Sequence, residues 1–245
     1  MGNFSSPELW GVTDDSDIAA LEDALSLERF ARYLDWADGD RRLAVGFYTL
    51  NTRLSESLYT PIQMLEIALR NRIHAVLSES SHDRWYDEPS CQFDPRQAEQ
   101  PANARAELAA AKKPDNPGRV VAALTFGYWT AFFNTDYEDL WRKRLHRIAK
   151  RPDGKSLTRK DFSRSLTPIR LLRNRIAHHE PILEWNLPKH YASILQLTEW
   201  LSPAAATWCR AHSRFEAVYP GDGIILHPGV PDSPPAARES PPATF

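Results

Sequence analysis

The chain has 245 residues, 42% of them hydrophobic and 25% charged, a composition typical of globular proteins and unlike that of disordered or fibrous ones. Its formal net charge of −2 indicates no class of binding partner. No apolar run approaches the roughly 18 residues needed to span a membrane, no signal-peptide pattern opens the chain, and Cys91 and Cys209 lie far apart without metal-type neighbours. We therefore expect a cytoplasmic protein with reduced thiols and no membrane partner.

Apolar residues recur at helical spacing in the first third of the chain. Leu43, Phe47, Leu50, Leu54 and Leu58 form one stripe of a helix. Pro61 then stands where a first helical turn accepts proline, so a second helix is expected to begin there. Residues 80–100 lack periodicity and predict a long irregular connection, followed by a helix near 101–113.

The second half of the chain also has helical periodicity. Residues 120–150 begin apolar and aromatic and then become basic and amphipathic. Thr158 and Asp161 resemble a capping box that opens a helix running to about His179, with Pro168 inside it. A last long helix is predicted over 188–213.

These elements predict an all-α fold, a helical bundle with additional helices. We expect an N-terminal arm at 1–15, a helical domain over 16–215 and an extended, disordered proline-rich tail over 216–245. The predicted core contains the following apolar residues of the stripes: Leu43, Phe47, Leu50, Leu54, Leu65, Leu69, Leu172 and Ile176.

Charge is distributed unevenly along the chain. Residues 1–40 carry ten acids and two bases, whereas residues 137–175 carry thirteen bases and four acids. A basic block attracts polyanions even in a protein that is acidic overall, although it can also be a solvated surface paired with the acidic N-terminal part. We expect RNA to contact the block through Arg142, Lys143, Arg144, Arg147, Lys150, Arg159 and Lys160.

The segment 173–178, Arg-Asn-Arg-Ile-Ala-His, is a polar interruption of a helix that is otherwise apolar on one side. At about 100° per residue, Asn174 and His178 share a helix face, whereas Arg173 lies about 140° away from His178. Unless the long Arg173 side chain bends round the helix, the two do not point at one spot, and a second helix or a second copy of the chain would help to build the pocket. An imidazole can transfer protons of a ribose hydroxyl, and a guanidinium can hold a phosphate, which suits RNA cleavage without metal.

The stretch RNRIAHHEPI (173–182) resembles the RN-x-x-x-H signature of HEPN domains in the form carried by Abi-like abortive-infection proteins, the AbiD/AbiF group. Three further blocks are similar to that family and follow in its order: residues 25–34, 47–73, and 124–133 with 140–143. The resemblance implies a HEPN-type bundle, homodimers that join two motifs, and a toxin-like endoribonuclease of antiviral (phage) defence that hydrolyses RNA. An RNA or protein antitoxin is a further candidate partner, which the sequence does not name.

The resemblance assigns catalysis to Arg173, Asn174 and His178, with accessory candidates Arg175, His179, Glu66, Arg70 and Asn71. We expect His179 to matter less than His178, because only His178 matches the motif. The sequence LRNRI occurs twice, at 69–73 and at 172–176. This repeat offers a monomeric alternative, in which one chain supplies both halves of the site. A second alternative is a non-catalytic HEPN module that binds RNA, a nucleotide or a partner.

Other chemistries lack their sequence patterns. His178-His179-Glu180 has neither the spacing of a zinc-binding helix nor a cysteine pair, so no metal is expected. No phosphate-binding loop, dinucleotide fingerprint or nucleophile elbow occurs, so no cofactor is expected.

Overall fold

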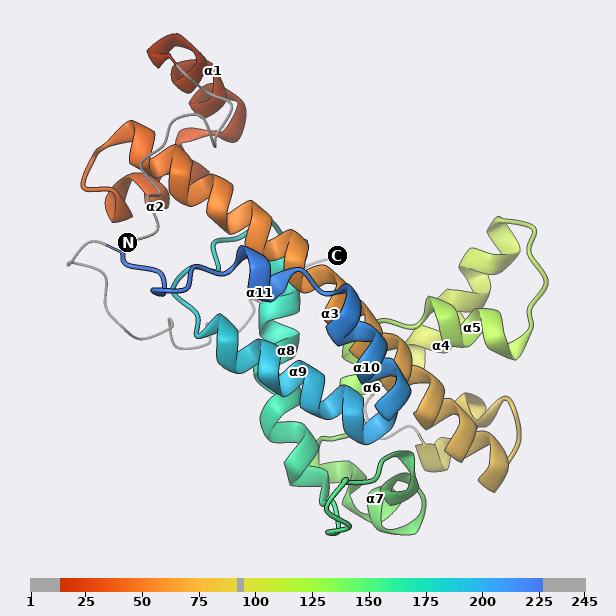
Figure 1. Cartoon of the computed structure of the whole chain (residues 1–245). Coiled ribbons are helices and arrows are strands. Elements are labelled where there is room, and N and C mark those ends of the chain that lie inside the picture. Colours follow the sequence, from red (N-terminus) through yellow and green to blue (C-terminus); the bar gives the residue numbers. More distant parts are fainter. Residues whose placement is uncertain (1–13, 92–94, 227–245) are drawn as a thin grey trace. The chain divides into compact units, whose positions relative to one another are not determined.

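The computed structural model describes residues 14–91 and 95–226, and every regular element within these ranges is a helix (Figure 1). The predicted all-α class is therefore confirmed. The α-helices are α1 (Asp15–Leu25), α2 (Leu27–Trp36), α3 (Arg41–Ser80), α4 (Pro95–Ala110), α5 (Pro117–Ala123), α6 (Phe126–Ala131), α7 (Glu138–Lys143), α8 (Arg159–Ala177), α9 (Leu187–Leu201), α10 (Pro203–His212) and α11 (Phe215–Val218). Short 3-10 helices are η2 (Trp85–Asp87), η3 (Pro89–Cys91), η4 (Thr135–Tyr137) and η5 (Leu145–Ile148).

The chain forms two compact units, each assembled from segments that are distant in sequence. Unit 1 contains the chain up to Leu58, then Arg175–Leu187, and then the chain from Arg214 onward. Unit 2 contains Tyr59–Asn174 and Pro188–Ser213. The long helix α3 contributes to both units, and so does α8.

Aromatic residues of α2 form the core of unit 1. Phe30, Tyr33 and Trp36 are buried, and the Tyr33 ring meets Trp36 edge-on with their centroids 5.4 Å apart. Asp14 caps α1, since its carboxylate accepts hydrogen bonds from the backbone of Ser16 and Asp17. The segment that follows α8 buries further apolar side chains in this unit: Ile182, Leu183 and Leu187.

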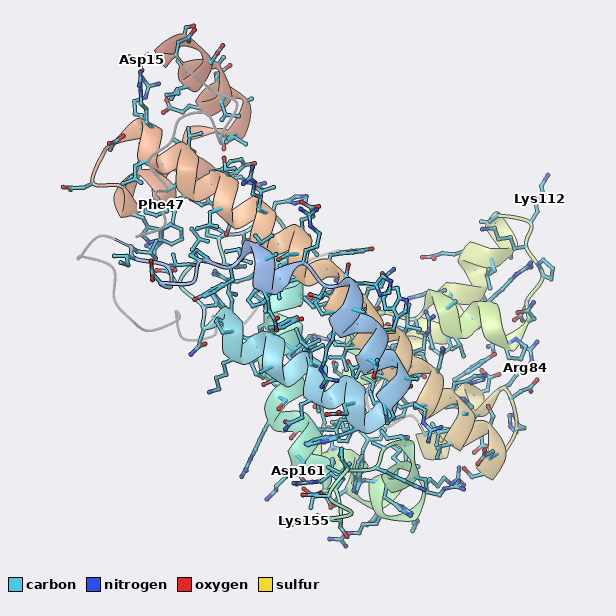
Figure 2. The ribbon with its side chains drawn as sticks, in the orientation of Figure 1. Asp15, Phe47, Arg84, Lys112, Lys155 and Asp161 are labelled. Carbon is cyan, nitrogen blue, oxygen red and sulfur yellow. The ribbon has the colours of Figure 1, made fainter. Side chains whose placement is uncertain are left out.

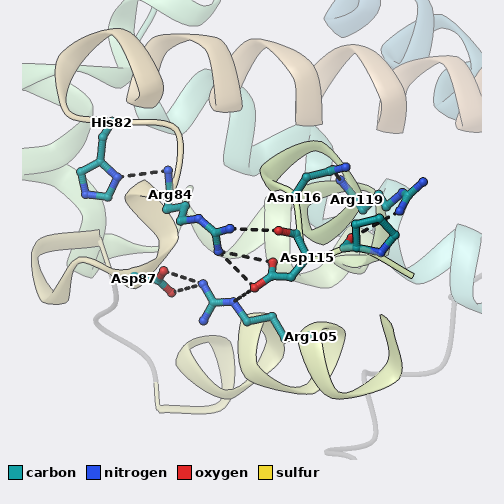
Figure 3. A network of polar contacts seen from close by, with 8 residues as sticks. His82, Arg84, Asp87, Arg105, Asp115, Asn116 and Arg119 are labelled. Atoms are coloured by element: carbon teal, nitrogen blue, oxygen red, sulfur yellow. Dashed lines mark hydrogen bonds and ion pairs between the residues drawn. The ribbon is translucent and has the colours of Figure 1, made fainter. Parts of the chain in front are cut away.

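Unit 2 has a larger aromatic core, in which Trp85 contacts Trp129 and Phe132 edge-on at 6.1 and 5.7 Å. A polar network on this unit joins the turn after α4 to η2 (Figure 3). There Arg84 binds Asp115 at 3.2 Å, and Arg105 binds both Asp87 and Asp115. Because these charges are paired with one another, we assign the network to fastening the α4–α5 turn.

The predicted capping box at the start of α8 is confirmed. The Asp161 carboxylate accepts from the Thr158 backbone N–H at 2.7 Å, and the Thr158 hydroxyl accepts from the Asp161 N–H at 3.3 Å. The backbone N–H of Thr158 lowers the pKa of Asp161 below its ordinary value, since it favours the charged carboxylate. Asp161 and the preceding loop residue Lys155 are labelled in Figure 2.

Several predicted boundaries are wrong. Pro61 lies inside one continuous helix of 40 residues, α3, because the apolar stripe keeps its helical phase from Leu58 to Ile62 across the proline. The helix expected near 101–113 begins earlier, at Pro95, and carries Pro101 within it. The single helix expected over 188–213 is two helices, since Ser202 caps a new start before Pro203.

Most of the predicted core is buried, and two residues of it are not. Phe47, Leu50, Leu54, Leu65, Leu69 and Leu172 are all buried. Leu43 and Ile176 are only half-buried. Both stand in a terminal turn, Leu43 at the start of α3 and Ile176 at the end of α8, where fewer neighbours pack against a helix. Residues 227–245 of the predicted tail lie outside the described residues.

Candidate functional site

The polar motif lies at the C-terminal end of α8, where the helix stops in a hydrogen-bonded reversal. The Glu180 N–H donates to the Arg175 carbonyl at 2.8 Å, and the His179 N–H donates to the Ile176 carbonyl at 3.1 Å. This pair of bonds is the Schellman motif, which places its next-to-last residue in the left-handed region. That residue is His179, with φ 57°, where glycine avoids a cost of roughly 1–2 kcal/mol.

The Arg175 side chain fastens the segment that follows this reversal. Its Nη1 donates to the Pro181 carbonyl at 2.7 Å, and its Nε lies 3.4 Å from the Glu180 carboxylate. Its guanidinium carbon also stands over the Trp185 ring, 5.7 Å from the centroid. The Arg175 guanidinium thus contacts three residues of the segment that follows α8, and it holds that segment in place.

The same segment is also tied to other helices of unit 1. The Asn51 side-chain oxygen accepts a hydrogen bond from the Ile182 N–H at 2.7 Å, and Asn51 is only 4% exposed. Glu184 binds Arg32 of α2 at 2.6 Å. Ile182 and Leu183 are also buried, so both polar contacts and apolar packing hold the segment in unit 1.

His178 and His179 are exposed within this anchored segment. Neither imidazole has a hydrogen-bond or ion-pair partner among residues 14–91 and 95–226. Both side chains are thus free to meet a ligand, while their backbone is held in place.

In unit 2, Arg173 is half-buried near the end of α8, and it interacts electrostatically with Glu66 of α3. Burial raises the pKa of Glu66, while the positive charges of Arg173 and Arg70 oppose that rise. Arg70 also donates to the Asn71 side chain at 3.5 Å. Glu66 is therefore within electrostatic range of both Arg173 and Arg70, and Asn174, the residue after Arg173, is half-buried.

One predicted RNA-binding residue is corrected by the structure. Arg159 is 5% exposed, its Nε binds Glu138 at 2.7 Å, and its Nη1 donates to the Phe133 carbonyl. The Arg159 guanidinium links the start of α8 to the start of α7, and its donors are used inside the protein instead of facing a ligand. Arg144 is half-buried as well, with a buried Nη1.

The other predicted RNA-binding residues are exposed: Arg142, Lys143, Arg147, Lys150 and Lys160. Arg142 pairs with Glu138 at 3.6 Å and Arg147 with Glu79 at 3.5 Å, so the block is partly neutralised. Arg164, which we did not select from the sequence, is exposed one helical turn after Lys160. The i, i+4 spacing of these two cations along a predicted helix was the signal that could have found it.

The described ranges contain no group of three or more His, Cys, Asp or Glu side chains placed to hold a metal ion. Within the same ranges, no helix has the length and apolarity required to cross a membrane.

No protein-family model matches the chain, and neither the curated proteins nor the solved structures contain a significant match to it.

Proposed function

We propose that the protein is a metal-independent endoribonuclease of HEPN type, acting as a toxin in defence against phage. One observation carries the proposal: an exposed imidazole without a partner, His178, stands on a helix end whose following segment is fastened at several points. An imidazole that is not used inside the protein and leaves the chain from an anchored backbone is available to transfer a proton of the substrate.

The chemistry follows from the residues of the motif. The attacking nucleophile is the 2′-hydroxyl of the RNA itself, so the protein has to move protons and stabilise charge on phosphorus. His178 transfers a proton, Arg173 supplies positive charge to the phosphate, and Asn174 orients one of the two. The carboxylate of Glu66 interacts electrostatically with Arg173 and lowers the net positive charge around it. The products are a 2′,3′-cyclic phosphate or 3′-phosphate and a 5′-hydroxyl.

The decisive experiment incubates the pure protein with total cellular RNA in EDTA. We expect cleavage that persists in EDTA and leaves the ends named above. His178→Ala should lower the rate about 10²–10⁴-fold, the usual contribution of a positioned acid or base, and Arg173→Ala should cause a loss of similar size. His212→Ala is the matched control, because His212 is also an exposed histidine at the end of a helix. Activity that requires an added divalent metal, or full activity in folded His178→Ala, would refute the proposal.

We infer that the active form is a two-fold homodimer, with the Arg173 of one copy serving the His178 of the other. Mixing Arg173→Ala with His178→Ala tests this directly. In a mixed dimer, one site keeps both an arginine and a histidine, so activity should return to a fraction of the wild-type value. A site completed within one chain gives no such recovery. Light scattering should show twice the chain mass of 27.9 kDa.

The second candidate is a HEPN module that binds RNA without cutting it, favoured by the exposed cations Lys143, Lys150 and Lys160. Both functions predict RNA binding that weakens as salt rises. Only the enzyme predicts new RNA ends and growth arrest that His178→Ala abolishes in cells.

A further inference from the structure

The chemistry proposed above requires two proton transfers at opposite sides of one phosphorus. A base removes the proton of the 2′-hydroxyl, whose oxygen then forms the new bond to phosphorus. An acid protonates the 5′-oxygen as its bond to phosphorus breaks. One imidazole that performs the first step already carries the proton it took, so a second group is needed if both transfers accompany the same displacement.

The titratable side chains of the anchored segment after α8 offer few choices for this second group. Glu180 lies 3.4 Å from the Arg175 guanidinium, and Glu184 binds Arg32 at 2.6 Å. Both carboxylates are committed to ion pairs with arginines. Of the segment's titratable groups, the imidazoles of His178 and His179 are left exposed and without a partner in the described part of the chain.

The backbone at His179 supports a role for its side chain. His179 occupies the left-handed position of the Schellman motif, where glycine is the ordinary residue. Arg175 binds the carbonyl of Pro181 and the carboxylate of Glu180, so the chain is held immediately after His179. The backbone position from which the His179 imidazole extends is therefore fixed, next to that of His178.

We propose that His179 is the second proton-transfer group, one of the two imidazoles acting as base and the other as acid. The inference rests on the proposed ribonuclease function and gives His179 a larger role than its sequence match suggests. Arg175 is then a positioning residue for both histidines.

His179→Gly separates catalysis from folding. Glycine accepts the left-handed backbone without strain, so the variant should melt a few degrees higher or at the same temperature, while cleavage falls about 10²-fold or more. Lys112→Gly is the matched control, because Lys112 ends α4 in the same left-handed position with φ 52°. It should change melting in the same direction and leave cleavage unaltered.

A substrate whose leaving 5′-oxygen is replaced by sulfur identifies the acid, since a thiolate leaves without protonation. We expect this substrate to restore the rate of exactly one of the variants His178→Ala and His179→Gly. If His179→Gly cleaves RNA as fast as the wild type while His178→Ala does not, the inference is wrong and the ribonuclease function stands. If the sulfur substrate rescues neither variant, the division of roles is wrong. If the wild type cuts no RNA, the proposed function itself fails.

Discussion

Replacing Asn51 with alanine removes one acceptor from the segment that carries the candidate histidines. The Asn51 oxygen takes the Ile182 N–H at 2.7 Å, and Ile182 is fully buried, so no water can replace the lost partner without opening the structure. An orphaned buried donor costs about 1–3 kcal/mol, which corresponds to an opening equilibrium larger by roughly 5- to 150-fold. We expect this change to be concentrated in residues 175–187.

Hydrogen exchange measured by mass spectrometry on a peptide spanning Ile182 is the direct assay, since it reports local opening. Thr198→Val is the control: the Thr198 hydroxyl is also buried and donates to the Ile194 carbonyl at 2.8 Å, but that carbonyl lies within α9 and keeps its helical partner. In Asn51→Ala, kcat for RNA cleavage should fall more than KM changes, because the backbone that carries the histidines is no longer fixed. Unchanged exchange at Ile182 in Asn51→Ala would refute the reasoning.

Three further outcomes follow from the structure. Arg159→Met should lower the free energy of unfolding by about 1–3 kcal/mol, because it leaves the Phe133 carbonyl without its hydrogen-bond donor. Lys160→Ala should change the free energy of unfolding by less than about 0.5 kcal/mol and should weaken RNA binding. Urea unfolding measures the first effect and filter binding the second. The folded-state pKa of Asp161 is depressed, so its stabilising effect is present above the unfolded value near about 3.9 and is lost as pH falls through the folded value. Asp161→Asn should flatten the fall in melting temperature below about pH 4, and an unchanged slope would contradict the capping role. Arg175→Lys keeps the charge but loses the fork that reaches both Pro181 and Glu180, so cleavage should drop while RNA affinity measured by filter binding stays the same.

The helical class and much of the core could be predicted, because periodicity records which side of a helix is buried. Phe47, Leu54 and Leu172 were found in this way. The spacing of apolar residues stays helical across Pro61, so the sequence did indicate that α3 is continuous there. The prediction of a helix start at Pro61 was wrong because it relied on the proline instead of on this spacing.

The environment of Arg159 could not be predicted, because it depends on where Glu138 and the Phe133 carbonyl lie after folding. Counting charge along the chain places Arg159 with the exposed Lys160, although the two side chains have opposite roles. At the candidate site, the motif named His178 and Arg173, whereas the left-handed backbone at His179 is visible only in the structure.

The interleaving of the two units has a consequence for the order in which the chain can fold as it is synthesised. Domains generally fold as units during synthesis, the N-terminal one first. Here Asn51 must wait for Ile182, which is made 131 positions later, and unit 2 must wait for Pro188–Ser213. Asn51, Arg32 and Arg175 therefore gain their partners in the segment after α8 only once residues 180–184 have been made. Under the proposed ribonuclease function, the candidate site is therefore not assembled until Arg175–Leu187 and Pro188–Ser213 have been made.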